Sequence, residues 1–483
     1  MFLKQRRIGE RVVLAIQDIV KKMNLVPAEI FRAYDIRGIV GETLTLLGVE
    51  AIGRALASVV LAAGEKSVVV ACDGRLSGPS LKAALSKGIQ STGCDVVDIG
   101  MVPTPVLYFA THHLKIPSGV MITGSHNPPE YNGLKMVVSG KALYGQGILA
   151  LYDKIQKGLY TRGNGAYSYQ EIDALYQAAI QKDIGVLRAL KIVVDCGNGV
   201  PGNIAPLLYQ ALGCEVIALY CEVDGTFPNH HPDPGQPKNL EALIATVKKE
   251  KADLGLAFDG DGDRLGLVDN QGKIIWPDRQ LILFAKALLI DNPHAKIIFD
   301  VKCSRHVALE IKKAGGEPIM WKTGHSLIKA KIQETGALLA GEMSGHLFFN
   351  DRWFGFDDAL YAGARILSIF SGQYPQKTVA EVFSALPDSI NTPELMLPVT
   401  EADKFKIIER LVSLADFDEA IISTMDGLRI DFSDGFGLVR ASNTGPNLIL
   451  RFEGDTVYAL QSIQTKFRQL LQVVLPEAEL PFS

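Results

Sequence analysis

The pattern of apolar and polar positions repeats three times along the chain. Runs rich in β-branched residues begin at Lys66, Lys191 and Lys296, and each leads through a turn of small or polar residues into a helical pattern. Each helical pattern stops at a Gly close to an acidic residue, before another extended run: Gly93-Cys94-Asp95, Gly213-Cys214-Glu215 and Gly316-Glu317. Because strand, helix, Gly stop and strand in this order are typical of βαβ units, the pattern predicts three similar mixed α/β domains.

The C-terminal part of the chain has a different pattern. The dipeptides Asp426-Gly427 and Asp434-Gly435 separate extended runs, which predicts a meander of β-hairpins. A helix is expected from about Thr456, because apolar residues follow at helical spacing: Val457, Leu460, Ile463, Phe467, Leu470 and Val474. This part therefore reads as a smaller α+β domain, and the Pro-containing stretch 374–393 is the expected hinge.

We place the domain boundaries at residues 1–171, 172–273, 274–385 and 386–483. The N-terminus is amphipathic, and we expect a helix docked on the body with its apolar residues on one side: Ile8, Val12, Ile16, Ile19 and Val20.

Composition and charge narrow the classes of function. Of the 483 residues, 47% are hydrophobic and 21% are charged, an ordinary globular composition. Lys and Arg total 49 against 53 Asp and Glu, which argues against a general binder of nucleic acid. No apolar stretch reaches the roughly 18 residues of a membrane span, and charges interrupt the N-terminus where a signal peptide would be apolar. The six Cys residues form no CxxC pair, so we expect reduced thiols and a cytoplasmic protein.

The segment DGDGDR, from Asp259 to Arg264, is the clearest chemical signal. It lies between the apolar runs LGLAF and LGLV and is therefore a loop between two buried extended segments. Carboxylates at Asp259, Asp261 and Asp263 can converge on one hard cation such as Mg²⁺, and without a cation three like charges so close are unfavourable. The positions that an EF-hand gives to Gly and Glu hold Arg264 and Asn270, which excludes that motif. The loop predicts a metal site with coordination left open for a substrate oxygen.

A second loop, TGSHNPPEYNGLK, follows an apolar run and presents Ser125 among Gly, Asn and Pro residues. Taken alone, this position is better explained by an ordinary capping or turn Ser. A hydrolase triad fits poorly, because the loop lacks the GxSxG elbow. With a metal site and Lys135 in the same chain, a phosphorylated Ser125 becomes a serious alternative.

Two further polar loops suit the binding of a sugar phosphate. GEMSGH offers Glu342 and Ser344 to sugar hydroxyls and His346 as an acid or base. RASNTGPN places Arg440 before hydroxyl and amide side chains, which suits a phosphate clamp. On local evidence either loop could also be an ordinary polar turn. No GxGxxG or GxxxxGK[ST] motif stands where nucleotide binding needs it, so neither a Rossmann nor a P-loop site is supported.

Together and in this order, the four loops resemble those of the α-D-phosphohexomutase superfamily, and within it the bacterial phosphomannomutase/phosphoglucomutase branch. The resemblance runs from FRAYDIRG at Phe31 to the C-terminal domain, and the joint occurrence of the four motifs is far more specific than any one of them. It implies four domains around a central cleft, each lending one loop to it. It also implies small phosphosugar substrates, no nucleic-acid or membrane partner, and a monomer or weak homo-oligomer.

Roles follow from the resemblance residue by residue. Ser125 would be the phosphoserine, and the metal ligands for Mg²⁺ would be a phosphate oxygen of Ser125 with Asp259, Asp261 and Asp263. The sugar hydroxyls would contact Glu342 and Ser344. The phosphate that does not react would be held by four residues: Arg440, Ser442, Asn443 and Thr444. Other matching cleft positions are Tyr34, Arg37, Lys135, Arg264, Lys302 and His325. The candidates for proton transfer, which the sequence leaves unranked, are His346, Lys135 and Arg37.

The implied reaction is the reversible interconversion of hexose 1-phosphate and hexose 6-phosphate, with mannose, glucose or both as the sugar. Phosphorylated Ser125 gives its phosphoryl group to the free hydroxyl, the 1,6-bisphosphate turns around, and its other phosphate returns to Ser125. A hexose 1,6-bisphosphate would be the activator that first phosphorylates Ser125. The alternatives are a phosphoglucosamine mutase, a Mg²⁺-dependent sugar phosphatase and a non-catalytic sugar-phosphate binder.

Two features depart from the branch. Gly445 stands where relatives commonly have a second Thr in the phosphate loop, which removes a hydroxyl and adds flexibility. The N-terminal helix before Phe31 is longer than usual, and we assign it no function.

Overall fold

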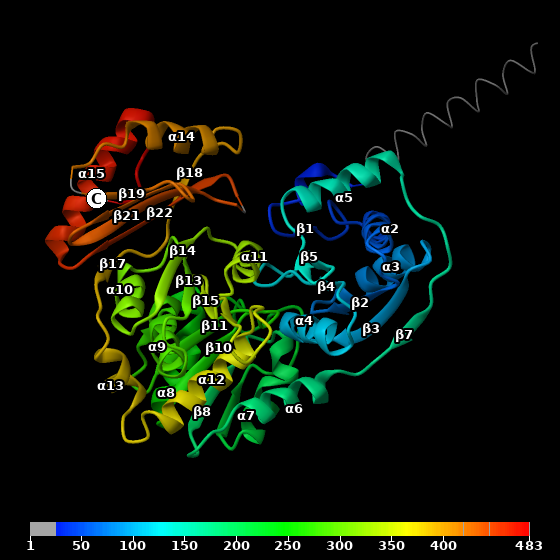
Figure 1. Ribbon diagram of the computed structural model, residues 1–483, viewed down its shortest axis with the longest axis horizontal. Helices are drawn as coiled ribbons and strands as arrows, with labels where there is room; N and C mark the ends of the chain where they lie inside the picture. Colours follow the sequence, from blue (N-terminus) through cyan, green and yellow to red (C-terminus); the bar gives the residue numbers. More distant parts are fainter. Residues whose placement is uncertain (1–25, 419, 444, 483) are drawn as a thin grey trace, which may run out of the picture.

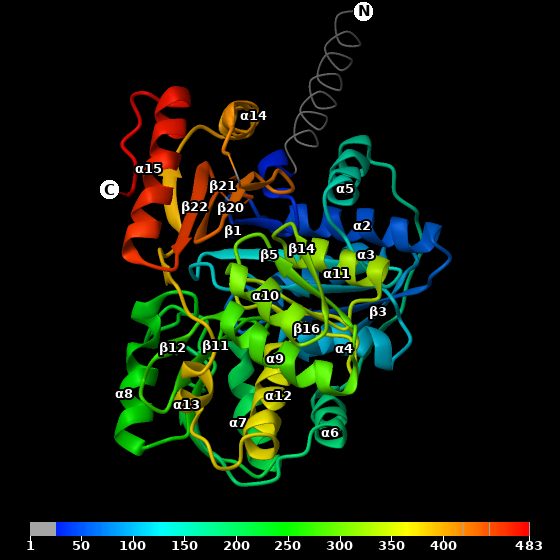
Figure 2. The ribbon, with the colours of Figure 1, turned by 60° about the vertical axis from the view of Figure 1, so that its left-hand side comes forward.

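Each of the three repeated sequence patterns builds a sheet with the same arrangement of four strands. The computed structural model describes residues 26–418, 420–443 and 445–482 (Figures 1 and 2). In each sheet the first strand of the pattern lies between two parallel neighbours, and one of these neighbours pairs antiparallel with a fourth strand. The shared orders are β3-β2-β4-β5, β9-β8-β10-β11 and β14-β13-β15-β16. The prediction of three similar mixed α/β domains is confirmed.

The first domain has the strand order β1-β5-β4-β2-β3-β7, with β6 beside β5. Its strands are β1 (Ile36–Ile39), β2 (Ser67–Cys72), β3 (Asp95–Met101), β4 (Gly119–Ile122), β5 (Tyr131–Val138), β6 (Lys141–Ala142) and β7 (Tyr167–Tyr169). The chain enters through η1 (Ala28–Ile30), and the helices are α2 (Leu46–Ala62), α3 (Gly78–Gln90), α4 (Thr104–His113) and α5 (Gln146–Lys157). Helices α2 and α3 pack with their backbones close, because a Cβ at Gly88 would lie 2.1 Å from the Glu50 carbonyl oxygen.

The second domain has the strand order β12-β11-β10-β8-β9. Its strands are β8 (Lys191–Asp195), β9 (Glu215–Leu219), β10 (Leu254–Phe258), β11 (Leu265–Asp269) and β12 (Ile274–Ile275). Its helical elements are α6 (Asp173–Asp183), η2 (Val200–Asn203), α7 (Ala205–Ala211), η3 (Pro237–Leu240) and α8 (Glu241–Glu250). The predicted loop between two buried extended segments is the turn of the antiparallel β10–β11 hairpin.

The third domain has the strand order β14-β13-β15-β16. Its strands are β13 (Lys296–Asp300), β14 (Glu317–Trp321), β15 (Leu339–Gly341) and β16 (Leu347–Phe349). Its helices are α9 (Pro277–Asp291), α10 (Arg305–Lys313), α11 (His325–Thr335), α12 (Ala359–Gly372) and α13 (Val379–Ser384). The left-handed Gly after α10 is Gly315, with φ +83°, one residue before the stop predicted at Gly316. The expected hinge at 374–393 contains α13 and the two-residue strand β17.

The C-terminal domain is the predicted α+β domain and lies above the third domain in Figure 1. The antiparallel order is β17-β22-β21-β20-β19, with β18 also beside β22. The strands are β17 (Ile390–Asn391), β18 (Leu395–Pro398), β19 (Ile421–Ser423), β20 (Leu428–Phe432), β21 (Gly435–Ala441) and β22 (Asn447–Gly454). The helices α14 (Lys404–Leu414) and α15 (Val457–Val474) pack on this sheet. Helix α15 begins where the sequence predicted, and the Thr456 hydroxyl caps it.

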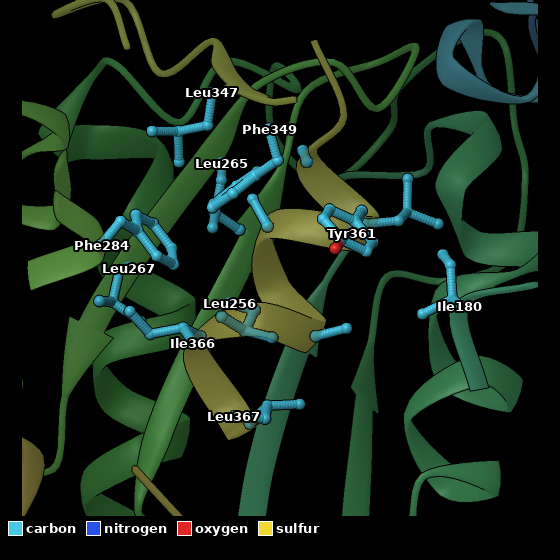
Figure 3. Packing of buried hydrophobic residues seen from close by; sticks show 14 of the residues in the cluster. Ile180, Leu256, Leu265, Leu267, Phe284, Leu347, Phe349, Tyr361, Ile366 and Leu367 are labelled. Atoms are coloured by element: carbon cyan, nitrogen blue, oxygen red, sulfur yellow. The ribbon is translucent and has the colours of Figure 1, made fainter. Parts of the chain in front are cut away.

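One apolar core joins the first three domains. Helix α12 places Tyr361 and Ile366 in one cluster with Leu256 and Leu267 of the second domain, and Phe349 lies between Tyr361 and Phe284 of α9 (Figure 3). The same cluster of buried residues includes side chains of α4 from the first domain. Because this core is continuous, we expect the first three domains to behave as one rigid body.

The C-terminal domain has its own core and contacts the third domain through polar groups and through a small apolar cluster of Val301 with Phe436 and Leu438. Arg429 donates to the carbonyl oxygens of Val301 and Cys303 at 2.6 and 2.8 Å. Lys302 pairs with Glu394 at 2.6 Å. Interfaces of this kind between domains are more easily rearranged than a shared apolar core.

Among the described residues, no helix is both long and apolar enough to cross a membrane.

Asp358 is a buried polar junction inside the shared core. Its carboxylate caps α12 by accepting from the Tyr361 N–H at 2.9 Å, and it also accepts from the Tyr176 hydroxyl and the Trp353 indole. Asp358→Ala leaves three donors unpaired, so we expect it to lower the free energy of unfolding by about 3 kcal/mol or more. Tyr176→Phe removes one donor and should cost about 1 kcal/mol. Urea denaturation compares the two variants, and equal losses would contradict this account.

Candidate active site

Loops from all four domains meet at one cavity of about 270 Å³. In the three α/β domains each loop joins the third strand of the shared pattern to its antiparallel partner: β4 to β5, β10 to β11 and β15 to β16. The fourth loop joins β21 to β22. Eight of the predicted site residues line the cavity: Tyr34, Arg37, Ser125, Lys135, Arg264, His325, His346 and Asn443. The repeated fold therefore brings segments far apart in the sequence to one place.

Ser125 is held in an unusual backbone conformation. Its φ is +48°, a left-handed value that a non-Gly residue adopts at a cost of about 1–3 kcal/mol. Its N–H donates to the Thr123 hydroxyl at 2.7 Å, and its own hydroxyl donates to the Asp259 carboxylate at 2.8 Å. The Ser125 hydroxyl thus points from the first domain into the acidic loop of the second.

Arg75 fixes this loop and was missed in the sequence. Its guanidinium is fully buried and donates to four backbone carbonyls, those of Ser125, Asn127, Pro128 and Tyr131. Asp73 pairs with the Arg75 Nε at 3.2 Å. A Cβ at Gly124 would lie 2.3 Å from the Arg75 guanidinium carbon, so only Gly fits there. The one feature of the sequence that could have indicated this role is the pair of opposite charges, Asp73 and Arg75, in the turn after β2.

The three carboxylates of the acidic loop are fully buried. Oxygens of Asp259, Asp261 and Asp263 lie within 4.8 Å of one another. Burial raises the pKa of Asp259, and the neighbouring carboxylates raise it further. Burial also acts to raise the pKa of Asp261, but the Lys135 ammonium outweighs it and holds that pKa well below the usual range.

The donor set fits a hard divalent cation. Asp261 Oδ1 and Asp263 Oδ1 are buried with no hydrogen-bond partner among the described residues, and both belong to the cluster. Lys135 pairs with both residues, with its Nζ 2.7 Å from Asp261 Oδ2. Oxygen donors at this spacing, beside the Ser125 hydroxyl, are the ligands that Mg²⁺ prefers. The residues could therefore bind a metal.

His346 lies between a cation and a carboxylate. Its Nε2 accepts a hydrogen bond from the Arg264 Nε at 3.1 Å, which leaves the ring proton of the neutral form on Nδ1. That Nδ1 lies 3.1 Å from Asp357 Oδ2, and His325 Nδ1 lies 3.5 Å from the same oxygen. Asp357 is fully buried and pairs with Lys329 at 2.8 Å. The sequence analysis missed Asp357. Two adjacent acidic residues, Asp357 and Asp358, directly before α12 could have indicated it.

The predicted sugar-contacting residues Glu342 and Ser344 do not line the cavity in this structure. Glu342 is buried, its carboxylate accepts from the Gly324 N–H at 2.5 Å, and burial raises its pKa to about 7. Ser344 is half-buried in the same loop. Lys302 is also set back, in its ion pair with Glu394.

In the C-terminal domain, Arg440 and Ser442 are buried and do not line the cavity. Asp426 pairs with the Arg440 Nε at 3.1 Å and accepts from the Thr323 N–H at 3.0 Å. The Ser442 carbonyl oxygen accepts from Lys404 at 2.7 Å. Asp426 and Lys404 were not singled out as site residues in the sequence, although Asp426 belongs to a recognised turn. Thr444, predicted to bind phosphate, lies outside the described residues.

Asn443 is the point where the C-terminal domain contacts the first domain. Its side-chain amide donates to the Tyr34 hydroxyl, and that hydroxyl donates to the Thr323 carbonyl oxygen at 2.7 Å. Three domains thus meet around Tyr34.

Comparison with known proteins agrees with this architecture. Four family models match consecutive parts of the chain: the phosphoglucomutase/phosphomannomutase α/β/α domains I, II and III at residues 28–161, 172–272 and 276–390, and the C-terminal domain at 394–470.

Similar whole proteins are also known. The chain is 57% identical to a phosphomannomutase/phosphoglucomutase of Pseudomonas aeruginosa over 95% of this chain and 99% of that one. It is 51% identical to a phosphoglucomutase of Neisseria meningitidis over 92% and 97%. A solved structure of a phosphoglucomutase/phosphomannomutase family protein from Burkholderia thailandensis superposes with a TM-score of 0.90 at 50% identity, over 95% of this chain and 100% of that one. With four matched domains in order and relatives of this identity along nearly the whole chain, the protein belongs to the phosphoglucomutase/phosphomannomutase family.

Proposed function

We propose that this enzyme interconverts hexose 1-phosphates and hexose 6-phosphates, with mannose or glucose as the sugar, through a phosphorylated Ser125. The observation that carries the proposal is the Ser125 hydroxyl, held 2.8 Å from Asp259 in a cavity to which all four domains contribute. The relatives named phosphomannomutase/phosphoglucomutase support the choice of reaction. A phosphoglucosamine substrate has no observation in its favour.

The proposed cofactor is Mg²⁺, held by Asp259, Asp261, Asp263 and an oxygen on Ser125. Such an ion supplies positive charge next to the oxygens of the transferring phosphoryl group. Buried oxygens of Asp261 and Asp263 that have no hydrogen-bond partner among the described residues support this assignment. A hexose 1,6-bisphosphate is the proposed activator that first phosphorylates Ser125.

The cationic side chains of the cavity stabilise charge on the transferring group. Arg37 and Arg264 line the cavity beside Ser125, and Lys135 reaches it from β5. The Arg37 guanidinium also donates to the Gly124 carbonyl oxygen at 2.8 Å, so it is fixed to the loop that carries the phosphoryl group. Positioning and charge stabilisation of this kind account for most of the catalysis of phosphoryl transfer.

Of the three candidates for proton transfer, we favour His346. An Arg guanidinium such as that of Arg37 does not release its proton in proteins. Lys135 is fixed as a cation between two carboxylates. His346 has one nitrogen toward Arg264 and one toward Asp357, and an imidazole in this position can take up a proton on one nitrogen and release it from the other. Asp357 then acts as the group that orients the ring.

Reorientation of the bisphosphate requires a cleft that opens while the acidic loop at residues 259–264, called the metal loop from here on, keeps its place beside Ser125. A large apolar core keeps the first three domains together, whereas the C-terminal domain is docked by polar contacts and one small apolar cluster. We propose that movement of this domain carries Arg440, Ser442, Asn443 and Thr444 toward and away from the phosphate that does not react. Glu342 and Ser344 would contact the sugar in the closed form. The domain boundaries, a monomer or weak homo-oligomer, and a cytoplasmic location stay predictions.

The first test removes the nucleophile. Ser125→Ala should lower kcat by at least about 10⁴-fold, because no other group can carry the phosphoryl between the two positions of the sugar. Formation of hexose 6-phosphate measures turnover, and calorimetry should still detect binding of the sugar phosphate. Ser139→Ala is a matched control, because Ser139 also has a left-handed φ, of +52°, in the same domain. Turnover retained by Ser125→Ala would refute the phosphoserine.

The second test concerns the metal. Asp261→Asn should weaken Mg²⁺ binding by at least about 100-fold, and removal of Mg²⁺ by a chelator should abolish turnover reversibly. Isothermal titration with Mg²⁺ measures the affinity. Asp253→Asn, a change at a partly exposed carboxylate in the same domain, should leave it unaltered. Equal Mg²⁺ affinity in the two variants would contradict the assignment.

The third test uses pH. Because burial raises the pKa of Glu342 to about 7, its carboxylate is present above that pH and is protonated below it. If the carboxylate accepts from sugar hydroxyls, kcat/KM should fall as the pH drops through about 7. Glu342→Gln should lower kcat/KM and abolish this part of the pH dependence. The substrate phosphate titrates in both proteins, so the difference between the two profiles isolates Glu342, and identical acid limbs would count against it.

A further inference from the structure

Two thiols lie close together in the second domain, behind the metal loop. Cys196 follows β8 and Cys221 follows β9, and their Sγ atoms are 3.5 Å apart. Cys196 is fully buried, whereas Cys221 is half-buried and is the member nearer to solvent. Neither residue has a part in the proposed mutase reaction.

The backbone places this pair within reach of a disulfide. Strands β8 and β9 are parallel neighbours with Asp195 opposite Leu219, and the Cys196 N–H donates to the Leu219 carbonyl oxygen at 3.2 Å. Tyr220 has a left-handed φ of +50°, which turns the chain before Cys221. Neighbouring strands are about 4.7–4.9 Å apart, and a disulfide needs Cα atoms about 4.4–6.8 Å apart. The sulfurs must approach by roughly 1.5 Å to form the bond.

The two thiols differ in reactivity. The Cys221 sulfur lies 3.5 Å from that of Cys196 and 3.4 Å from the carbonyl oxygens of Val194 and Leu219. Burial raises the pKa of Cys196 well above the usual value. The thiolate is the form that attacks an oxidant, and attack also requires access. Both conditions select Cys221 as the first thiol to react, with Cys196 as the thiol that resolves the product.

The pair is in mechanical contact with the metal loop. Cys196 begins the turn that ends at Gly199, and the Gly199 N–H donates to the Cys196 carbonyl oxygen at 2.7 Å. A Cβ at Gly199 would lie 2.9 Å from the Gly260 Cα, so the two backbones touch. The next residue, Val200, donates its N–H to the Gly260 carbonyl oxygen at 3.1 Å. Gly260 separates Asp259 from Asp261, so a displaced turn displaces the metal ligands.

We propose that Cys196 and Cys221 form a reversible oxidation site that lowers activity by moving the metal loop. With a hydroperoxide as oxidant, the Cys221 thiolate attacks one peroxide oxygen and the O–O bond breaks. Cys221 becomes a sulfenic acid, and the other oxygen leaves as hydroxide or alkoxide and takes up a proton. The Cys196 sulfur then attacks the Cys221 sulfur and releases the hydroxyl as water. With hydrogen peroxide, two thiols and one peroxide give one disulfide and two waters. A dithiol reductant reverses the change by thiol–disulfide exchange.

The test treats the purified full chain with hydrogen peroxide and follows two readouts. Peptide mass mapping should find a Cys196–Cys221 disulfide, and mutase activity should fall by at least about tenfold, because shifts of about 1 Å near the reacting groups cost up to 10²-fold. Dithiothreitol should restore both. Only the activity readout rests on the proposed function. A disulfide found in a protein without mutase activity would support the oxidation site and contradict the proposed function, so the two failures can be told apart.

Variants identify the site. Cys221→Ser should keep its activity in peroxide, whereas Cys214→Ser, which changes another buried thiol of the same domain, should lose activity reversibly like the unaltered protein. Absence of the disulfide would overturn the proposal. A disulfide with full activity would overturn its coupling to the metal loop, and equal inactivation of Cys221→Ser would overturn the assignment of the thiols.

Discussion

The site depends on compensating the negative charge of three buried carboxylates that lie within five residues of sequence. Their mutual repulsion and the loss of hydration both oppose ionisation, and the high pKa of Asp259 is the consequence. Lys135 from the first domain supplies the compensating charge through ion pairs to Asp261 and Asp263. The same strand hairpin carries Ser125, so the charge balance that holds two domains together also places the Ser125 hydroxyl against the acidic loop.

The repeated topology explains how distant segments converge. In each α/β domain the loop at the site joins the third strand of the pattern to an antiparallel fourth strand, so equivalent positions of three sheets carry the proposed nucleophile, the proposed metal ligands and the loop proposed to contact the sugar. The continuous core around α12 fixes their relative positions. The fourth loop comes from a domain with its own core, docked by polar contacts and one small apolar cluster, which suits the proposed role of this loop in gripping and releasing a phosphate.

The sequence predicted much of this arrangement because its signals are local. The runs at Lys66, Lys191 and Lys296 become central strands, and DGDGDR becomes a hairpin turn, since strand and turn preferences act over few residues. The supporting groups Arg75, Asp357 and Asp426 were missed, because each acts through partners that only the fold brings near. The same reason hid the closeness of Cys196 and Cys221, which read as dispersed thiols. Glu342 and Arg440 do not line the cavity, and this too depends on how the domains dock, which local sequence patterns do not encode.

The central claim is that the phosphoryl group passes through Ser125 without reaching water. The most direct measurement is a phosphorus NMR time course of the protein with Mg²⁺, mannose 1-phosphate or glucose 1-phosphate, and a trace of glucose 1,6-bisphosphate. The account predicts that the 6-phosphate appears with no accompanying inorganic phosphate, because the closed cleft excludes water from the phosphorylated serine. Steady accumulation of inorganic phosphate in place of the 6-phosphate would contradict it and would make the protein a phosphatase.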